Sequence, residues 1–133
     1  MQKQRVFSRI KRELRGLKRK KIGVLGLAFK PNTDDIRGAP AIDICQKLLG
    51  AGALIQAYDP AAMLNSRKVL NDSNVRFCRD AYAAATGVDA LWIATDWNEF
   101  RNINLVRIKS VMQGPVLFDS RNVFDPVKVR ALG

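Results

Sequence analysis

The chain has 133 residues, a hydrophobic content of 47% and a formal net charge of +11, and this length suffices for a single domain with a buried core. It has no histidine and only two cysteines, Cys45 and Cys78, without metal-ligand spacing, which excludes His-based catalytic triads and most zinc sites. Its apolar runs fall short of the roughly 18 residues of a membrane span, and the basic N-terminus lacks a secretory signal's apolar stretch, so we expect no membrane span, a cytoplasmic location and free thiols.

The positive charge is concentrated at the N-terminus. Residues 1–21 hold ten Lys or Arg residues and one Glu, a net charge of +9, whereas the other 112 residues carry only +2. Phe7, Ile10, Leu14 and Leu17 recur at helical spacing within this segment, which predicts a basic helix over about residues 1–19. This helix either docks on the domain by its apolar stripe, mediates self-association, or binds phosphate groups or an acidic membrane. No aromatic interleaving or base-reading motif supports a specific nucleic-acid partner.

Beyond this helix, apolar strand-like runs alternate with helical stretches. The predicted strands cover 22–28, 53–58, 74–78, 90–95 and 115–119, and the predicted helices lie near 38–51, 60–70, 79–86 and 104–113. This alternation indicates βαβ units, and therefore a three-layer, Rossmann-like α/β fold: a parallel sheet of about five strands flanked by helices. Segments 22–28 and 90–95 are apolar nearly throughout, so we expect them near the sheet centre.

Ligands of such sheets bind outside the carboxyl ends of the strands, which places the stretch "GLAFKPNTDDIR", at the end of the first predicted strand, among the candidates for ligand contact. It does not complete a dinucleotide fingerprint, because Ala28 and Pro31 stand where glycines are needed. Lys30 and Arg37 flank the expected start of a helix and favour an anion there. The alternative is that Asp34 and Asp35 cap this helix and pair with the two cations.

Polar residues also follow other strands. Arg121, in "FDSRNVFDP", suits bidentate recognition of phosphate or carboxylate, unless it pairs with a neighbouring aspartate on the surface. Asp59 precedes Pro60 and is interpreted as a cap, and Trp97 as a packing residue. Neither Cys45 nor Cys78 has a neighbouring base, so both are expected to be inert packing thiols.

Four motifs, "VLGLAFKPNTDDIR", "AYDP", "LWIATDWNEFR" and "FDSRNVFDP", occur in this order. Together they closely resemble the C-terminal domain of the UDP-glucose/GDP-mannose dehydrogenase family over about residues 20–127, most of all in members that oxidise UDP-glucose. Family members oxidise the C6 alcohol of a nucleotide sugar to a carboxylate in two NAD-dependent steps. They combine an N-terminal NAD-binding domain, a central dimerisation region with a catalytic cysteine, and a C-terminal UDP-sugar-binding domain.

The resemblance implies a role for individual residues. Phe29, Lys30 and Arg121 would contact the nucleotide sugar, and Arg37 would reach NAD held mainly by another domain. Residues 1–20 would lead into the UDP-sugar-binding domain at 21–133, with the NAD domain and the dimerisation region absent. The implied partners are a UDP-sugar, NAD and a second subunit in a full-length homodimer, and neither a catalytic residue nor a metal ligand is expected in this chain.

Two alternatives remain open on the sequence. The domain could hold a nucleotide sugar or another anion without taking part in chemistry, or the basic segment could make it an adaptor for nucleic acid or an acidic membrane.

Overall fold

A computed structural model describes residues 3–28, 35–36, 39–70, 72–95, 97–114 and 116–119. The chain forms one parallel sheet in the order β3-β2-β1-β4-β5. The strands are β1 (Lys21–Leu25), β2 (Leu54–Tyr58), β3 (Val75–Phe77), β4 (Ala90–Ile93) and β5 (Val116–Asp119). The five strands and their parallel arrangement confirm the predicted fold class. The first strand lies at the centre, with the fourth beside it, as their apolar composition indicated.

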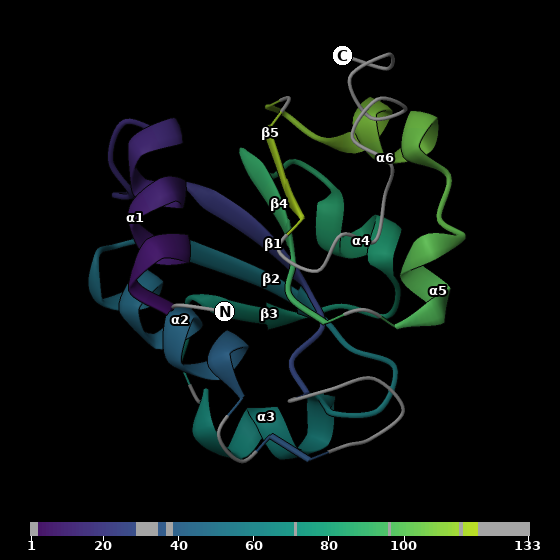
Figure 1. The fold of residues 1–133 in the computed structure, drawn as a ribbon, viewed down its shortest axis with the longest axis horizontal. Helices are drawn as coiled ribbons and strands as arrows, with labels where there is room; N and C mark the ends of the chain where they lie inside the picture. Colours follow the sequence, from purple (N-terminus) through teal and green to yellow (C-terminus); the bar gives the residue numbers. More distant parts are fainter. Residues whose placement is uncertain are drawn as a thin grey trace.

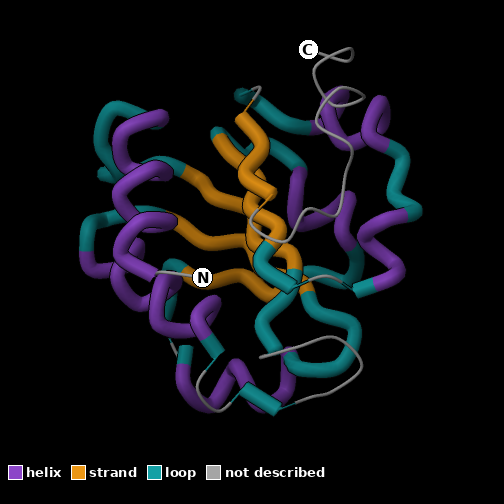
Figure 2. Tube along the Cα trace, viewed as in Figure 1, coloured by secondary structure: helices purple, strands orange, loops and turns teal. Residues whose placement is uncertain are grey.

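Helices cover both faces of the sheet (Figures 1 and 2). On one face lie α1 (Lys3–Glu13) and α2 (Pro40–Gly50), and on the other α4 (Ala81–Ala85), α5 (Asn98–Arg101) and α6 (Leu105–Val111). Helix α3 (Met63–Val69) connects β2 to β3 at the lower end of the view in Figure 1. The sequence did not predict α5, because a single turn is too short to show an apolar period.

The alternation of side chains along β4 separates the core into two clusters. Ala90 and Trp92 face the helices α1 and α2, whereas Leu91 and Ile93 face α4 to α6. All four side chains are buried. A strand covered on both faces must be apolar at every position, and this explains the uninterrupted apolar run that the sequence shows here.

Gly23 in β1 permits close packing of α4 on the sheet. A Cβ at this position would lie 2.7 Å from both the carbonyl oxygen of Ala84 and the Cδ1 of Leu91. The lack of a side chain at Gly23 therefore allows α4 to lie in direct contact with the sheet.

Helix α1 docks by the apolar stripe that the sequence predicted. Ile10 and Leu14 are buried and Phe7 is half-buried, in the same cluster as the apolar face of α2. The helix is shorter than predicted, because it ends at Glu13 and the backbone turns at Gly16, where φ is 106°. Leu17 is also buried, but it reaches the core from the turn that follows.

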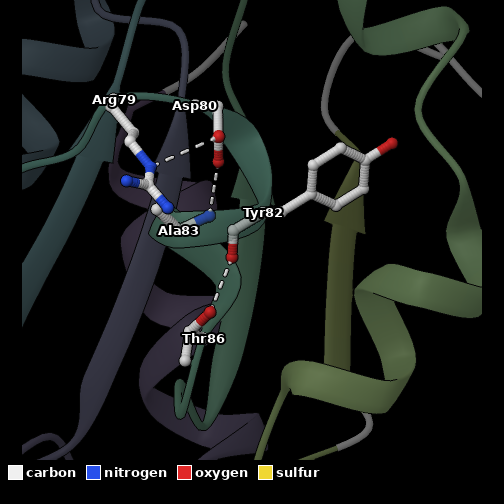
Figure 3. A network of polar contacts seen from close by, with 5 residues as sticks. All are labelled: Arg79, Asp80, Tyr82, Ala83 and Thr86. Atoms are coloured by element: carbon white, nitrogen blue, oxygen red, sulfur yellow. Dashed lines mark hydrogen bonds and ion pairs between the residues drawn. The ribbon is translucent and has the colours of Figure 1, made fainter.

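Helix α4 is fixed at both ends by polar contacts (Figure 3). At its start, Asp80 Oδ1 accepts a hydrogen bond from the backbone N–H of Ala83 at 2.7 Å. At its end, the hydroxyl of Thr86 donates to the carbonyl of Tyr82 at 2.8 Å. The amide of Gln56 in β2 also donates to the carbonyls of Ala84 (3.1 Å) and Thr86 (3.0 Å). The bonds from Gln56 hold the helix against β2. Together with the Thr86 hydroxyl, they satisfy carbonyls at the end of the helix that would otherwise lack donors.

Across the described ranges, no helix combines the length and the apolar character needed to cross a membrane.

Candidate functional site at the carboxyl edge of the sheet

The strand order reverses between β1 and β4. From β1 the chain builds outward to β2 and β3, and it then crosses to the other side of β1 to form β4 and β5. Ligands of open parallel sheets bind outside the carboxyl ends of the strands at such a switch point. The residues that follow β1, β2 and β4 therefore form the candidate site.

Asp59, directly after β2, joins the start of two loops. Its Oδ2 accepts hydrogen bonds from the backbone N–H groups of Leu27 (2.7 Å) and Ala28 (3.1 Å), which follow β1. Its Oδ1 accepts from the N–H groups of Ala61 and Ala62, both at 2.8 Å. The interpretation of Asp59 as a cap is thus confirmed for the turn before α3, and the same carboxylate also fixes the backbone after β1.

Residues after β4 complete this network. The indole Nε1 of Trp97 donates to Asp59 Oδ2 at 3.2 Å, and the Thr95 hydroxyl donates to the carbonyl of Ala28 at 2.9 Å. Thr95 is buried and Trp97 is half-buried. Trp97 is therefore a packing residue, as expected, and its indole also orients the carboxylate. Three separate loops of the carboxyl edge are held together by these contacts.

Gly26 makes the approach of the β1 and β4 loops possible. Its φ is +100°, a conformation that side chains disfavour, and a Cβ built there would overlap the side chain of Thr95. This glycine has no role in a dinucleotide fingerprint here. It allows the loops after β1 and β4 to lie in contact with each other.

Asp59 is fully buried, and within the described part of the chain no Lys or Arg forms an ion pair with it. Four backbone N–H groups and one indole N–H surround its carboxylate instead. Hydrogen bonds to an ionised carboxylate are stronger than those between neutral groups. The arrangement fixes the backbone geometry of the loops after β1 and β2.

Tyr58, the last residue of β2, is buried beside this network. Its ring meets that of Phe100 edge-on, with the centroids 6.1 Å apart. Burial, and then the hydrogen bond and charge of Glu99, raise the pKa of the Tyr58 phenol above its ordinary value. The phenol therefore stays protonated at neutral pH and acts as a packing group.

Neither cysteine is a candidate nucleophile. Cys45 is fully buried in α2, and burial raises the pKa of its thiol from 9.0 to about 12. Burial is also the main cause of the raised pKa of Cys78. Both thiols are free and protonated at neutral pH, which suits packing and opposes a role as nucleophile. Within the residues described, no group of three or more His, Cys, Asp or Glu side chains could hold a metal ion.

The residues that the sequence singled out for ligand contact, Phe29, Lys30, Arg37 and Arg121, lie outside the described residues. The structure does establish where their flanking strands end. β1 ends at Leu25 and β5 at Asp119, and both carboxyl ends lie at the same edge with β4 between them. Neighbouring strands are about 4.8 Å apart, so the ends of β1 and β5 are roughly 10 Å apart.

The long-range partners of Asp59 and Thr95 could not be read from the sequence. Both residues directly follow apolar runs, which is the available signal, because a polar residue at the carboxyl end of a buried strand must find a partner. The partner atoms belong to the backbone of Leu27 and Ala28, and backbone groups leave no trace in the sequence.

Comparison with known proteins gives this edge a context. Residues 23–126 match the sequence profile of the UDP-glucose/GDP-mannose dehydrogenase family, UDP binding domain. A UDP-glucose 6-dehydrogenase from Rhizobium meliloti (strain 1021) is 51% identical over 104 residues, which cover 78% of this chain and 23% of that protein.

Solved structures show the same relation. A UDP-glucose dehydrogenase from Pyrobaculum islandicum superposes with a TM-score of 0.80 at 35% identity, covering 91% of this chain and 26% of the other. The UDP-N-acetyl-mannosamine dehydrogenase Cap5O from S. aureus gives a TM-score of 0.75 at 28% identity, covering 92% and 27%. The chain thus spans about a quarter of the length of the proteins that it matches.

Proposed function

Because this chain belongs to the UDP-glucose/GDP-mannose dehydrogenase family, with residues 23–126 as its UDP-binding domain, we propose that it binds UDP-glucose for an NAD-dependent 6-dehydrogenase. In this reaction the C6 alcohol of the sugar is oxidised in two steps, and UDP-glucuronate is the product. The observation that carries the proposal is the match of the whole domain to proteins of this activity, at 51% identity in the Rhizobium meliloti relative. The choice of glucose over an N-acetylated sugar rests on that relative.

The geometry of the carboxyl edge supports the binding role. Asp59 and Thr95 fix the backbone of Leu27 and Ala28, which lead directly into Phe29 and Lys30. Lys30 and Arg121 each follow a strand that ends at this edge. A UDP-sugar brings two phosphate charges, and cations from two such loops would stabilise them by charge-assisted hydrogen bonds. Phe29 would contact the nucleotide sugar beside Lys30.

The proposed contact of this chain with the cofactor involves fewer residues than its contact with the sugar nucleotide. We propose that Arg37 reaches NAD that is bound mainly by a separate domain, and that residues 21–133 form the UDP-sugar-binding domain, with residues 1–20 leading into it. The complete enzyme would be a homodimer in the cytoplasm, where the free thiols of Cys45 and Cys78 stay reduced.

Catalytic groups are proposed to come from elsewhere in the complete enzyme. The thiols of Cys45 and Cys78 are buried and have raised pKa values, whereas covalent catalysis needs an accessible thiolate. The 133-residue chain alone should therefore produce no NADH from UDP-glucose and NAD.

A chimeric enzyme tests the assignment of residues. This chain replaces the matching segment of the Rhizobium meliloti relative, and Lys30→Ala, Arg121→Ala and Arg37→Ala are introduced separately. Loss of a shielded charge-assisted hydrogen bond of about 1.5–3 kcal/mol predicts a fall of roughly 10- to 150-fold in kcat/KM for the sugar with the first two. Arg37→Ala should instead raise the KM for NAD. Lys68→Ala, at an exposed position of α3, is the control and should leave both constants unchanged.

Direct titration tests the binding function separately. The full 133-residue chain is titrated with UDP-glucose, UDP-N-acetylglucosamine and GDP-mannose by calorimetry. We expect weak binding that prefers the UDP-sugars and weakens in Lys30→Ala and Arg121→Ala, because solvent and salt screen an open half of the site. Equal binding of all variants, or wild-type kinetics of Lys30→Ala and Arg121→Ala in the chimera, would overturn the proposal.

A further inference from the structure

The positive charge of this protein forms a surface of its own, apart from the proposed substrate site. Six cations of α1 and the turn after it are exposed, and we refer to them as the basic surface: Arg9, Lys11, Arg12, Arg15, Lys18 and Arg19. Helix α1 lies on the outside of the molecule, over α2 (Figure 1). The carboxyl edge of the sheet is formed by other elements, so the basic surface is a separate feature.

These cations are not neutralised by the domain. Among the described residues, none of the six forms an ion pair or a side-chain hydrogen bond. Glu13 is the one acid in residues 1–21, against ten Lys or Arg residues. Like charges held close on a folded surface repel one another, so an anionic partner that bridges them would be bound favourably.

The apolar face of α1 is already used. Ile10, Leu14 and Leu17 are buried against α2 and the sheet. Over residues 6–21, the part of this segment whose side chains are described, every exposed side chain is polar or charged, so this part offers no free apolar side to insert into a bilayer or to pair with a partner helix. Any partner of the basic surface must be recognised by charge alone.

The shape of the basic surface distinguishes between anionic partners. A small anion needs converging donors, but these cations are spread along a helix and a turn. A single nucleic-acid strand needs a positive groove with aromatic side chains for stacking. A pocket of about 330 Å³ in the described part of the structure is lined by Gln46, Leu49, Gly50, Val69, Leu70 and Asp72, and none of these is a cation. No Phe, Tyr or Trp belongs to the exposed residues of 6–21.

A second copy of this chain does not offer the complementary charge. Residues 22–133 carry a net charge of +2, and Asp59 is buried. Among the described residues, no three or more acidic side chains lie close enough together to hold a metal ion. An extended anionic plane, by contrast, requires only that the cations point outward.

We infer that the basic surface adsorbs this protein to membranes that contain acidic phospholipids. The contact is electrostatic, between the six cations and lipid phosphate groups, without insertion of the helix. This inference goes beyond the proposed function and does not depend on it, because no residue of the carboxyl edge takes part.

Vesicle co-sedimentation of the full 133-residue chain tests the inference. Vesicles of phosphatidylcholine alone are compared with vesicles of phosphatidylcholine and phosphatidylglycerol in equal amounts. We expect binding to the anionic vesicles only, and its loss at high salt as the Debye length shrinks. A quadruple variant with Arg9→Gln, Lys11→Gln, Arg12→Gln and Lys18→Gln should bind the anionic vesicles at least about tenfold more weakly.

The matched control removes as many charges elsewhere, with Lys68→Gln, Arg76→Gln, Arg79→Gln and Lys109→Gln at exposed positions. It should retain most of the binding. Every substituted side chain is exposed, so both variants should fold, and thermal unfolding checks that they do.

Equal loss of vesicle binding in the two variants would show that overall charge, and not the basic surface, is responsible. Duplex DNA or RNA that displaces the protein from vesicles at matched phosphate concentration would identify a nucleic acid as the preferred partner. Either result overturns the inference, as does equal binding to the uncharged vesicles.

Discussion

The hydroxyl of Thr95 donates a hydrogen bond to the carbonyl oxygen of Ala28 at 2.9 Å, although the two residues are 67 positions apart in the chain. Both are buried. This bond connects the loop after β4 to the loop after β1, across the point where the strand order reverses. It makes the geometry of one loop depend on the other.

Replacing Thr95 by Val should destabilise the domain by about 1–3 kcal/mol, because the buried carbonyl of Ala28 loses its side-chain donor while the volume of residue 95 stays nearly the same. Thr95→Ser keeps the hydroxyl and serves as the control, with a smaller loss from the missing methyl group. Urea denaturation measures the free energy of unfolding of each. A Val variant as stable as wild type would contradict a role for this hydrogen bond.

Asp59→Asn should lower the free energy of unfolding by more than Thr95→Val does, by about 3 kcal/mol or more. The amide has a single acceptor oxygen, whereas the two carboxylate oxygens accept from backbone donors of two loops. The N–H signals of Leu27 and Ala28, and the indole N–H signal of Trp97, should shift in NMR spectra. Asp72→Asn is the matched control, because exposed Asp72 accepts one backbone hydrogen bond, from Asn74. If the two variants unfolded at the same urea concentration, Asp59 would be an ordinary cap.

Gly26→Ala is expected to destabilise the domain by about 2 kcal/mol or more. The new methyl group overlaps the side chain of Thr95, and the φ of +100° is strained for alanine. Gly50→Ala, in α2, adds a methyl group with no atom within 4 Å and should be neutral or stabilising by up to about 1 kcal/mol. The difference in unfolding midpoint between these two variants is the measurement, and similar midpoints would argue against close contact of the two loops.

The buried thiol of Cys45 predicts a loss of stability in alkali. Its pKa rises from 9.0 to about 12 on folding, so above pH 9 the thiol ionises in the unfolded chain while it stays protonated in the folded one. The free energy of unfolding should therefore fall by about 1.4 kcal/mol per pH unit from this group between pH 9 and 12. Cys45→Ala lacks this contribution, and its stability deficit relative to wild type should shrink as pH rises from 8 to 11. A constant deficit would show that the thiol ionises equally in both states.

Much of the fold follows from apolar runs such as those around Val24 and Trp92, because strands covered on both faces must be apolar at each position. The end of α1 was predicted less well, since Leu17 continues the apolar stripe although the helix ends at Glu13 and the backbone turns at Arg15 and Gly16, both with positive φ. At the candidate site, the sequence indicated which residues follow the strands. It could not reveal that Asp59 binds the backbone of Leu27 and Ala28, because that pairing depends on which strands become neighbours. The predicted contacts of Phe29, Lys30, Arg37 and Arg121 stay predictions.

The central position of β1 has a consequence for folding during synthesis. One edge of this strand pairs with β2, which follows it closely in the chain, but the other edge pairs with β4, where Ile22 meets Ala90. While a ribosome adds the intervening residues, the β4-facing edge of β1 has no strand to pair with. An unpaired, apolar strand edge is a template for aggregation. This edge of the nascent chain is therefore open to pairing with other chains until Ala90–Ile93 emerge.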